Sequence, residues 1–492
     1  MRAPAPLIPP VLPRWPVILR VARHRYPAGY PDAALARIRA GTLFWPAVRA
    51  RAARPRALAL TPALRDAARA AFPDAEIAVG RDLSAVDPER LEAIFAPPAA
   101  PEILWAALGG IATPGVAAPD PQAALASAEG RSPWTGEALE LADAVEAQAL
   151  LRARAMAARG PLRLVGMTRW KRRCLAPFLT GPDGPPTAGR ATDGKGGAVR
   201  WGAGTDEETE AYTFRVEDGF LRSVGLGLRH TPPLSLTIHA GPPHFDATRS
   251  NAFETTVSDA LFTSDLLARA ARLRAAIACL GVTKYNLGGV EPLPDAQGRE
   301  AVLVPGQVAT DASIRLGARS VRTDLALLEA ARARFPDAFL LYKPHPDVAT
   351  GLREGAAAPE AVARLADATV VRADMAACLA WCDRVATITS LTGFEALLRG
   401  RAATCFGRPF YAGWGLTDDA DPPPRTRRLT LDELVAATLI LHPVYVDPAT
   451  RLPCPPEIAV ATLARQRAEA RRPTARAVRL WRDAASWALN RL

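Results

Sequence analysis

Short apolar runs alternate with helical stretches from about residue 160 to about residue 445. Several of these runs end in Gly, His or Ser, and they predict strands at residues 162–166, 198–201, 213–217, 301–305, 339–342, 384–388 and 403–406. Apolar positions of helical spacing predict helices at residues 258–280, 321–334 and 394–399. Strands of parallel sheets are buried on both faces, which produces such continuous apolar runs. The pattern therefore predicts an α/β fold built from βα units.

A stretch rich in Pro and Gly at residues 288–298 separates the predicted elements into two groups. This separation predicts two facing, doubly wound Rossmann-like domains, one over residues 156–290 and one over residues 291–445. Residues 1–155 mix short apolar strands with helical stretches and predict an additional N-terminal α/β region. Residues 446–492 predict a C-terminal helical tail.

The end of this tail has an amphipathic pattern. Over residues 474–492, Val478, Trp481 and Leu489 share one helical face, and most of the arginines lie elsewhere. The pattern suits a helix that lies on a membrane surface. An ordinary surface helix packed on the protein's own body has the same pattern and is the commoner case.

The charge of the chain is positive but dispersed. The 492 residues carry a formal net charge of +11, and only four of the cations are lysines: Lys171, Lys195, Lys284 and Lys343. The arginines are scattered along the chain, whereas a nucleic-acid surface needs clustered charge. We therefore expect no nucleic-acid partner. The positive balance suits a small anionic substrate or an anionic membrane surface.

The six cysteines form no C-x-x-C pair or other zinc spacing, so we expect buried thiols in a reducing compartment and no metal site. The first ten residues are rich in proline and form no continuous apolar segment. No stretch approaches the ~18–20 apolar residues that span a bilayer. These features predict a cytoplasmic protein, either free or peripheral to a membrane.

Two adjacent carboxylates, Glu217 and Asp218, stand with Gly219 at the end of the strand predicted at residues 213–217. Ligands of open α/β sheets lie beyond the carboxyl ends of the strands. The pair is therefore a candidate for general acid and base, while an Asp-Gly turn without chemistry is the alternative. A glycine-rich segment with Arg222 follows and favours an anionic ligand.

The segment Lys343-Pro344-His345-Pro346 follows the strand predicted at residues 339–342. Its prolines restrict the backbone, so that the lysine and the histidine are held in place. A fixed cation and imidazole at the edge of a sheet suit a phosphate or a nucleoside. A single histidine in a turn is more often structural.

Three further loops follow predicted strands. Residues 389–395 begin a helix with Ser390 and Thr392, which favours phosphate binding, although hydroxyls with Glu395 as a capping-box acid also make an ordinary helix start. Asp311, after the strand at residues 301–305, is either a nucleophile or a helix cap. Aromatic and glycine residues at 407–417 either stack on a sugar or wedge the two domains together.

Five segments occur together in this order: residues 217–227, 304–308, 342–348, 389–395 and 409–419. They closely resemble the capsular polysaccharide β-Kdo transferases of Gram-negative bacteria, the KpsC type, over about residues 162–448. The resemblance implies a GT-B-like fold and retaining transfer of Kdo from CMP-β-Kdo. It implies an acceptor in which Kdo residues are built on lysophosphatidylglycerol as the linker of a capsule. The implied partners are CMP-Kdo, a Kdo-linked glycolipid, the inner-membrane surface and the capsule export machinery.

The resemblance also implies roles for single positions. His345 and Pro346 match the CMP-binding pair, and Ser390 with Thr392 matches the contacts to the donor phosphate. Asp311 is the best match to the carboxylate nucleophile of a double displacement.

Double displacement requires a carboxylate that forms a covalent intermediate, as in retaining glycosidases. Asp218 is the alternative nucleophile, and it falls with Glu217 in the family's acidic motif as a candidate acid or base. Arg222 or Arg249 suits the Kdo carboxylate as a guanidinium fork.

Lys343, His345 and the helix that begins near Ser390 suit a CMP leaving group, so no metal and no cofactor is expected. Gln307 and Glu395 complete the candidate substrate-binding residues.

The best-known members of this family carry two transferase modules in one chain, whereas this chain has one complete set of motifs. Residues 105–110 faintly echo residues 410–415, so a degenerate first module is one interpretation of residues 1–155. Two other functions remain open: transfer of another CMP-activated acidic sugar, as by a sialyltransferase, and a non-catalytic scaffold for capsule assembly or export. The intact acids and His345 argue against the scaffold.

Overall fold

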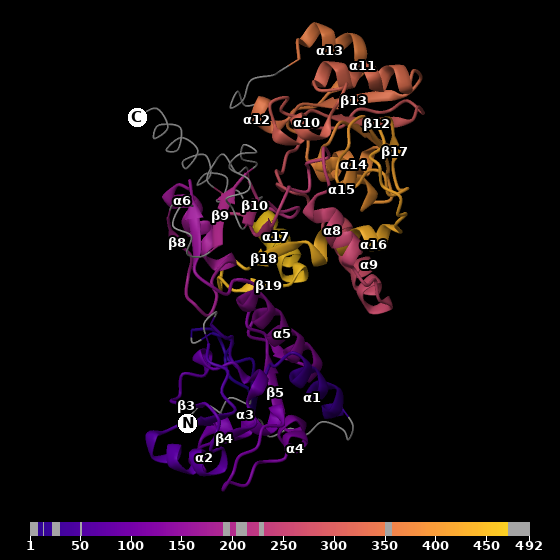
Figure 1. The fold of residues 1–492 in the computed structure, drawn as a ribbon. Helices are drawn as coiled ribbons and strands as arrows, with labels where there is room; N and C mark the ends of the chain where they lie inside the picture. The colour runs from indigo at the N-terminus through magenta and orange to yellow at the C-terminus, as the bar shows by residue number, and fades with distance from the viewer. Residues whose placement is uncertain are drawn as a thin grey trace. The chain divides into compact units, whose positions relative to one another are not determined.

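The structure is a computed structural model that describes residues 8–12, 14–21, 30–49, 52–189, 197–202, 214–225, 231–349 and 357–470. The chain divides into two compact units (Figure 1). The first comprises Met1–Val199 with Val446–Cys454, and the second comprises Arg200–Tyr445 with Pro455–Leu492. The amphipathic pattern of residues 474–492 lies outside the described residues.

The first unit contains small sheets and the helices that cover them. Strand β2 lies between β3 and β4 with parallel pairing, whereas β5 pairs antiparallel with both β1 and β6. The expected N-terminal α/β region is thus present. Its main elements are β1 (Leu19–Val21), α1 (Tyr30–Ala40), β2 (Ala57–Ala59), α2 (Arg65–Ala71), β3 (Ile77–Val79), β4 (Ala93–Phe95), α3 (Pro101–Gly109), α4 (Pro121–Ala126), β5 (Ala128–Arg131), β6 (Ala138–Leu139), α5 (Leu141–Ala157), β7 (Leu162–Val165), α6 (Arg169–Leu175) and β8 (Thr187–Ala188).

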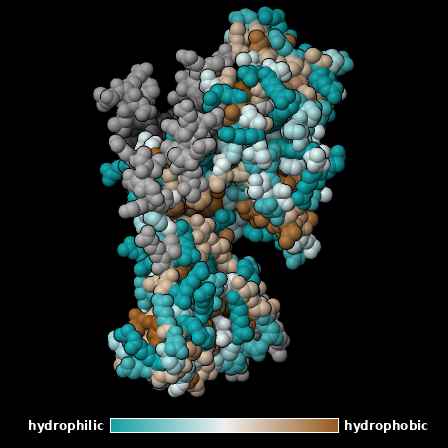
Figure 2. Space-filling view, viewed as in Figure 1, coloured by the Kyte–Doolittle hydropathy of each residue, from teal (hydrophilic) through white to brown (hydrophobic). Residues whose placement is uncertain are grey.

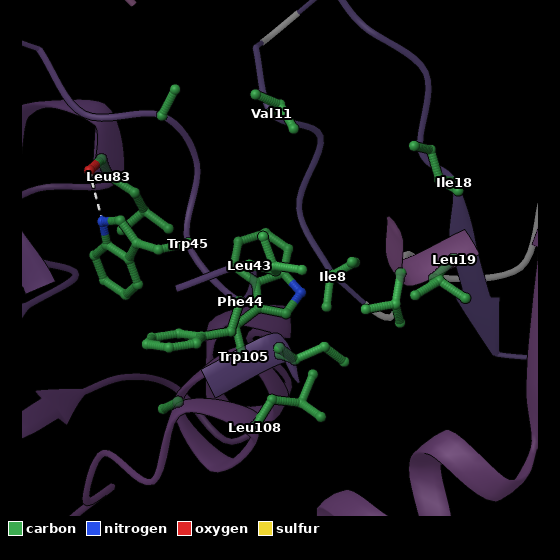
Figure 3. Packing of buried hydrophobic residues seen from close by; sticks show 14 of the residues in the cluster. Ile8, Val11, Ile18, Leu19, Leu43, Phe44, Trp45, Leu83, Trp105 and Leu108 are labelled. Atoms are coloured by element: carbon green, nitrogen blue, oxygen red, sulfur yellow. Dashed lines mark hydrogen bonds between the residues drawn. The ribbon is translucent and has the colours of Figure 1, made fainter. Parts of the chain in front are cut away.

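Trp45 is at the centre of the apolar core of this unit and is fully buried. Figure 3 shows its indole N–H donating to the Leu83 carbonyl, a hydrogen bond of 2.9 Å. The Arg152 guanidinium donates to the carbonyls of Trp45 and Pro46. A buried indole is stable where its polar atom finds such a partner, so the burial of Trp45 leaves its N–H group hydrogen-bonded.

The second unit contains a six-stranded, entirely parallel sheet in the order β14-β13-β12-β15-β16-β17. The expected parallel strands in βα units are confirmed here. The elements of this part are β12 (Ala301–Pro305), α10 (Ala312–Gly317), α11 (Asp324–Arg334), β13 (Phe339–Lys343), α12 (Pro346–Ala349), α13 (Pro359–Leu365), β14 (Ala368–Thr369), α14 (Met375–Trp381), β15 (Arg384–Thr387), α15 (Leu391–Leu397), β16 (Ala402–Cys405) and β17 (Asp418–Asp419).

Both faces of this sheet are buried. Val302 and Val304 of β12 pack with Leu327 and Leu328 of α11, while the intervening Leu303 packs with Leu379 of α14. Successive side chains of a strand point to opposite faces. This two-sided burial explains why the strands appear in the sequence as unbroken apolar runs.

A second set of strands in this unit departs from the parallel expectation. β10 (Phe214–Asp218) pairs antiparallel with β11 (Ser235–His239), and β11 pairs antiparallel with β18 (Pro443–Val446). A parallel pair needs a long crossover, usually a helix. The described residues between β10 and β11, 219–225 and 231–234, contain no helix, which fits the antiparallel pairing. β9 (Gly197–Trp201) corresponds to another of the predicted strands.

The helix expected over residues 258–280 is divided. α8 (Ala252–Asp259) ends early, and α9 (Ser264–Cys279) begins after Thr263, whose hydroxyl accepts from the Leu266 N–H as an N-cap. Ser and Thr at this position satisfy a helix's first N–H groups. The chain continues after β17 through α16 (Leu431–Val435), the π-helix η7 (Ala436–Leu441) and β18, and then through β19 (Pro453–Cys454) and α17 (Pro456–Ala470).

Residues 105–109 lie in α3, whereas residues 410–415 form consecutive turns and bends. The two segments that echo each other in sequence therefore differ in backbone structure.

The described helices include none that is both long and apolar enough to cross a bilayer. Teal hydrophilic, white and tan side chains are intermixed on the face drawn in Figure 2, and brown hydrophobic ones occur in small groups. Leu261, just before α9, is 85% exposed.

Candidate functional site

A cavity of about 1170 Å³ lies in the second unit, beyond the carboxyl ends of β10, β12, β13 and β15. Of the candidate site residues, only Arg222 and Arg249 are outside its lining, which includes Glu217, Asp218, Gln307, Asp311, Lys343, His345, Pro346, Ser390, Thr392 and Glu395. Segments far apart in the sequence therefore meet at one place. Ligands of α/β sheets bind at this edge.

Asp218 ends β10 and is held by a charged contact. One of its carboxylate oxygens, Oδ2, accepts from the Arg222 Nε at 2.7 Å. The Arg222 side chain is only 3% exposed, and its Nη1 donates to the Ser223 hydroxyl and to the Thr231 carbonyl. Arg222 therefore lies behind Asp218 and orients it, while Glu217 and Asp218 line the cavity itself.

Gly219 directly after this pair has no room for a side chain. A Cβ atom there would lie 2.2 Å from the Ser235 Oγ. The close approach allows the Ser235 hydroxyl to donate to the Leu221 carbonyl at 2.6 Å. The Asp-Gly turn is thus required by packing, and it also presents the two acids to the cavity.

Asp311 occupies the N-cap position of α10, but its side chain makes no capping hydrogen bond to that helix. Helix capping therefore does not account for this carboxylate. Asp311 is half-buried and lines the cavity. Its role as a nucleophile stays a prediction.

Gln307 connects two of the loops at the sheet edge. Its side-chain oxygen accepts from the Thr389 N–H at 2.8 Å, and its Nε2 donates to the Thr389 hydroxyl at 3.1 Å. Its own backbone N–H donates to Asp324 Oδ1 at 2.8 Å. Since the amide is occupied by protein partners, Gln307 fixes the loops that carry Asp311 and Ser390.

Asp324 is a buried acid that the sequence analysis did not identify. Besides Gln307 it accepts from the Tyr342 hydroxyl at 2.6 Å, and burial raises the pKa of its carboxyl. A Cβ atom on Gly306 would lie 2.5 Å from Asp324 Oδ2 and 3.0 Å from the backbone nitrogen of His345. Gly306 therefore allows the turn that holds His345 to lie directly against β12.

The Lys343 side chain is almost entirely buried and points along the cavity wall. Its Nζ donates to the Val371 carbonyl at 3.1 Å. Burial lowers the pKa of Lys343, with partial compensation from neighbouring anionic groups that include Glu291 and Asp374. Lys343 ends β13, and His345 follows it in the next turn; both line the cavity.

Ser390 caps α15, and its hydroxyl accepts from the Thr392 N–H at 3.2 Å and donates to the Thr392 hydroxyl at 3.0 Å. Glu395 takes no part in this cap. Its Oε1 accepts from the backbone N–H of Lys284 at 2.8 Å, and burial raises its pKa despite the opposing effect of Arg399. The capping-box alternative for Glu395 is therefore wrong, whereas Ser390 and Thr392 do line the cavity.

Lys284 also lines the cavity and was not among the sequence candidates. One signal could have identified it: the chain has only four lysines, and two of them, Lys284 and Lys343, line this one cavity. Burial would lower the pKa of Lys284, but the neighbouring Tyr285 and Asp218 outweigh it and hold the pKa above its usual value.

Aromatic and histidine rings form the floor on the side of β10. Phe410 lies 4.8 Å from Phe220 and 5.1 Å from Phe253, measured between ring centroids, and His244 lies 4.9 Å from Phe220. Phe410 is buried, as are Tyr411 and Trp414. The aromatic residues of the loop at residues 407–417 are therefore packed in the protein interior, and only Phe410 and Pro409 of this loop line the cavity.

The cavity lining combines carboxylates, cations and hydroxyls. Among the described residues, no group of three or more His, Cys, Asp or Glu side chains is placed to hold a metal ion. The arrangement suits an anionic, phosphate-containing substrate whose reacting carbon faces an acid. A carboxylate that faces such a carbon can act as a nucleophile or a base.

Comparison with known proteins shows which family the chain resembles. The family described as "Capsule polysaccharide biosynthesis protein" matches residues 265–445. Two solved structures from Thermosulfurimonas dismutans are similar: the KpsC β-Kdo 2,7 transferase, with 31% identity and a TM-score of 0.52, and the KpsC β-Kdo 2,4 transferase, with 32% identity and a TM-score of 0.55. Each match covers 62% of this chain, and 99% and 98% of the respective solved chain.

Two longer proteins are also similar. The capsule polysaccharide modification protein LipA of Neisseria meningitidis is 39% identical over 351 residues, which is 68% of this chain and 50% of LipA. The lipopolysaccharide-processing protein LpsZ of Rhizobium meliloti is 45% identical over 237 residues, 47% of this chain and 54% of LpsZ. This chain thus matches about half the length of these relatives. The matches place the chain in a class of capsule biosynthesis proteins. Within that class, the chain belongs to the KpsC-type family.

Proposed function

We propose that this chain is a retaining β-Kdo glycosyltransferase. It transfers Kdo from CMP-β-Kdo to a Kdo-terminated acceptor on lysophosphatidylglycerol, a step in building the linker of a capsular polysaccharide. The observation that supports this most is that Asp311, the acidic pair and the His345 turn line one cavity. The similarity to two KpsC β-Kdo transferases supports the choice of sugar.

In the first step the Asp311 carboxylate attacks the anomeric carbon of Kdo. A bond forms between that carbon and a carboxylate oxygen, and the bond to the phosphate oxygen breaks, so that its electron pair leaves with CMP. Lys343, His345 and the hydroxyls of Ser390 and Thr392 line the same cavity and can offset the negative charge on CMP. No metal or cofactor is required in this scheme.

In the second step an acceptor hydroxyl displaces the carboxylate of Asp311. Glu217 or Asp218 takes the hydroxyl proton, a new bond forms between the acceptor oxygen and the anomeric carbon, and the carboxylate leaves. Two displacements at one carbon give net retention. The hydrogen bond from Arg222 Nε holds the Asp218 carboxylate in one orientation for this proton transfer.

The proposed acceptor is a glycolipid, so the protein would act at the inner-membrane surface and deliver its product toward the capsule export machinery. No nucleic acid is involved. Incubation with CMP-Kdo and a Kdo-terminated acceptor should release CMP, and linkage analysis of the product would distinguish 2,4 from 2,7 transfer. Lack of turnover with several such acceptors would contradict the proposal, and competition by CMP-sialic acid would favour a different sugar.

The nucleophile can be tested separately. The Asp311→Asn variant should form no covalent Kdo adduct in intact-mass measurements with donor alone, because an amide cannot replace the attacking carboxylate, and its turnover should fall by roughly 10³-fold or more. Asp265→Asn, an exposed acid in the first turn of α9, is the matched control. An adduct at the wild-type level in Asp311→Asn would transfer the role to Asp218.

A further inference from the structure

Lys284 lies in a tight turn that contacts both sides of the cavity. Its backbone N–H donates to Glu395 Oε1 at 2.8 Å, and its backbone carbonyl accepts from the N–H groups of Arg222 and Ser223 at 3.1 Å each. The turn thus connects α15, which begins after Ser390, with the segment that follows the acidic pair. Lys284 makes both connections with its backbone N–H and carbonyl groups, so replacing its side chain leaves these hydrogen bonds in place.

Asn286 shapes this turn. Its backbone has φ near +50°, a left-handed conformation that Asn tolerates better than most residues. Its side-chain amide donates to the carbonyls of Thr283 and Ser223 and accepts from the Thr283 N–H. The position of Lys284 on the wall is therefore fixed by several hydrogen bonds.

The Lys284 ammonium is available for a ligand in a way that the neighbouring cations are not. Arg222 is committed to Asp218, and Lys343 to the Val371 carbonyl. Arg249 forms an ion pair with Asp246 and lies outside the lining of the cavity. Across the described residues, no carboxylate oxygen lies within 4 Å of the Lys284 ammonium. Its Nζ lies 5.3 Å from the Tyr285 ring centroid, and Tyr285 and Asp218 both raise its pKa.

The position also suits a substrate with two anionic groups. Glu395, which binds the Lys284 backbone, lies five residues after Ser390, and five residues of helix extend roughly 7 Å along the axis. The turn that carries Lys284 is therefore held by the helix that begins after Ser390, and Lys284 and Ser390 line the same cavity. Glu217 and Asp218 line the same cavity, and Asp218 is close enough to Lys284 to raise the pKa of its ammonium.

We propose that the Lys284 ammonium binds the carboxylate of the transferred sugar acid and so selects an acidic sugar over a neutral one. The inference rests on the proposed function, because it assigns a subsite within the same cavity. A bound carboxylate would give the lysine the ion pair that it lacks among the described residues. Charge-assisted hydrogen bonds of this kind are about twice as strong as neutral ones.

The test compares Lys284→Met and Lys284→Arg with the wild type. Lys284→Met should lower kcat/KM for CMP-Kdo by about 30-fold, while CMP affinity measured by calorimetry and the KM for the acceptor stay within about 2-fold. Lys284→Arg should recover part of the loss because it keeps the charge. Lys171→Met, which removes a lysine outside the cavity, is the matched control and should behave as the wild type.

A donor whose sugar carboxylate is blocked as a methyl ester provides the second arm. With this donor, the kcat/KM of the wild type should fall about as far as that of Lys284→Met falls with CMP-Kdo. The kcat/KM of Lys284→Met should fall little further with the ester, since both changes remove the same ion pair. Fully additive losses, a matching loss of CMP affinity, or an effect on the acceptor KM alone would each overturn the inference. Lack of turnover by the wild type would instead overturn the proposed function, and the Lys284 assignment would fall with it.

Discussion

Asp218 and Arg222 form an ion pair beside the cavity, with 2.7 Å between Oδ2 and Nε. The arginine side chain is 3% exposed and the aspartate side chain 28% exposed. The other carboxylate oxygen, Oδ1, is buried and has no hydrogen-bond partner among the described residues. A pair of this kind holds an acid in one orientation while leaving one oxygen available for a proton.

Replacing Arg222 tests this positioning role. Arg222→Met should lower kcat by about 10-fold or more and destabilise the protein by about 2–3 kcal/mol, because it leaves a partly buried carboxylate without its counter-charge. CMP affinity should change little, since the guanidinium lies outside the cavity lining. Steady-state kinetics with calorimetric CMP binding checks this, and Arg222→Lys should partly restore kcat. A loss of CMP binding equal to the loss of kcat would show that Arg222 contacts the nucleotide.

The sequence predicts most single residues of the site because each follows an apolar run that ends at the sheet edge. Asp311, Lys343, His345 and Ser390 are all of this kind. Lys284 and Asp324 are not, since their importance depends on contacts with residues far along the chain, such as the Lys284–Glu395 hydrogen bond across 111 positions. Spacing along a sequence contains no signal for such contacts.

At the scale of elements, the buried His239 and His442 and the half-buried His244 lie where β11, the segment before α8 and the end of the π-helix η7 meet. The rings of His239 and His442 stack with centroids 6.1 Å apart, and His244 also lies 6.1 Å from His442. Burial lowers the pKa of His239 to about 4 and that of His442 to about 3, with Arg215 and His239 respectively as the second causes. Burial also lowers the pKa of His244. All three rings are therefore neutral near pH 7.

This cluster predicts acid sensitivity. The folded pKa values of His239 and His442 lie below the ordinary value near 6.5, so their contribution to stability is complete above about pH 6.5 and is lost as the pH falls toward 4 and 3. The free energy of unfolding should fall by roughly 1 kcal/mol per pH unit for each such histidine. Urea denaturation between pH 7 and pH 5 measures this, and His239→Phe should flatten the dependence. An unchanged slope in that variant would exclude His239 as a cause.

The elements themselves differ in how far the sequence predicts them. The six-stranded sheet is predictable because two-sided burial leaves continuous apolar strands such as residues 301–305. β11 alternates polar and apolar residues around Thr237 and was missed. The division between α8 and α9 was also missed, because Thr263 acts as an N-cap inside an apolar pattern that continues on both sides.

At the scale of the whole molecule, each of the two compact units has its own core, and the residues that line the cavity all belong to the second. In the first unit Trp45 is fully buried, and in the second Trp414 donates its indole N–H to the Phe410 carbonyl at 2.8 Å. Replacing each tryptophan in turn therefore tests whether loss of stability in one unit changes the CMP affinity of the cavity.

Trp45→Ala should destabilise the first unit by about 3–5 kcal/mol through the cavity that it leaves, while CMP affinity stays within about 2-fold. Trp414→Ala should instead weaken CMP binding, because Phe410 lines the cavity and depends on that contact. Hydrogen exchange by mass spectrometry locates the loss of protection, and calorimetry measures CMP affinity. A similar loss of CMP affinity in both variants would contradict the separation.

The segment Val446–Cys454 belongs to the first unit although the chain reaches it only after nearly all of the second. Leu452 is 6% exposed within the core around Trp45, and the Pro453 carbonyl accepts from the Trp134 indole at 3.0 Å. Ribosomes add about 5–20 residues per second, so these last contacts of the first unit form roughly tens of seconds after its residue 199 has been made. During this time its core is incomplete and accessible to chaperones and proteases.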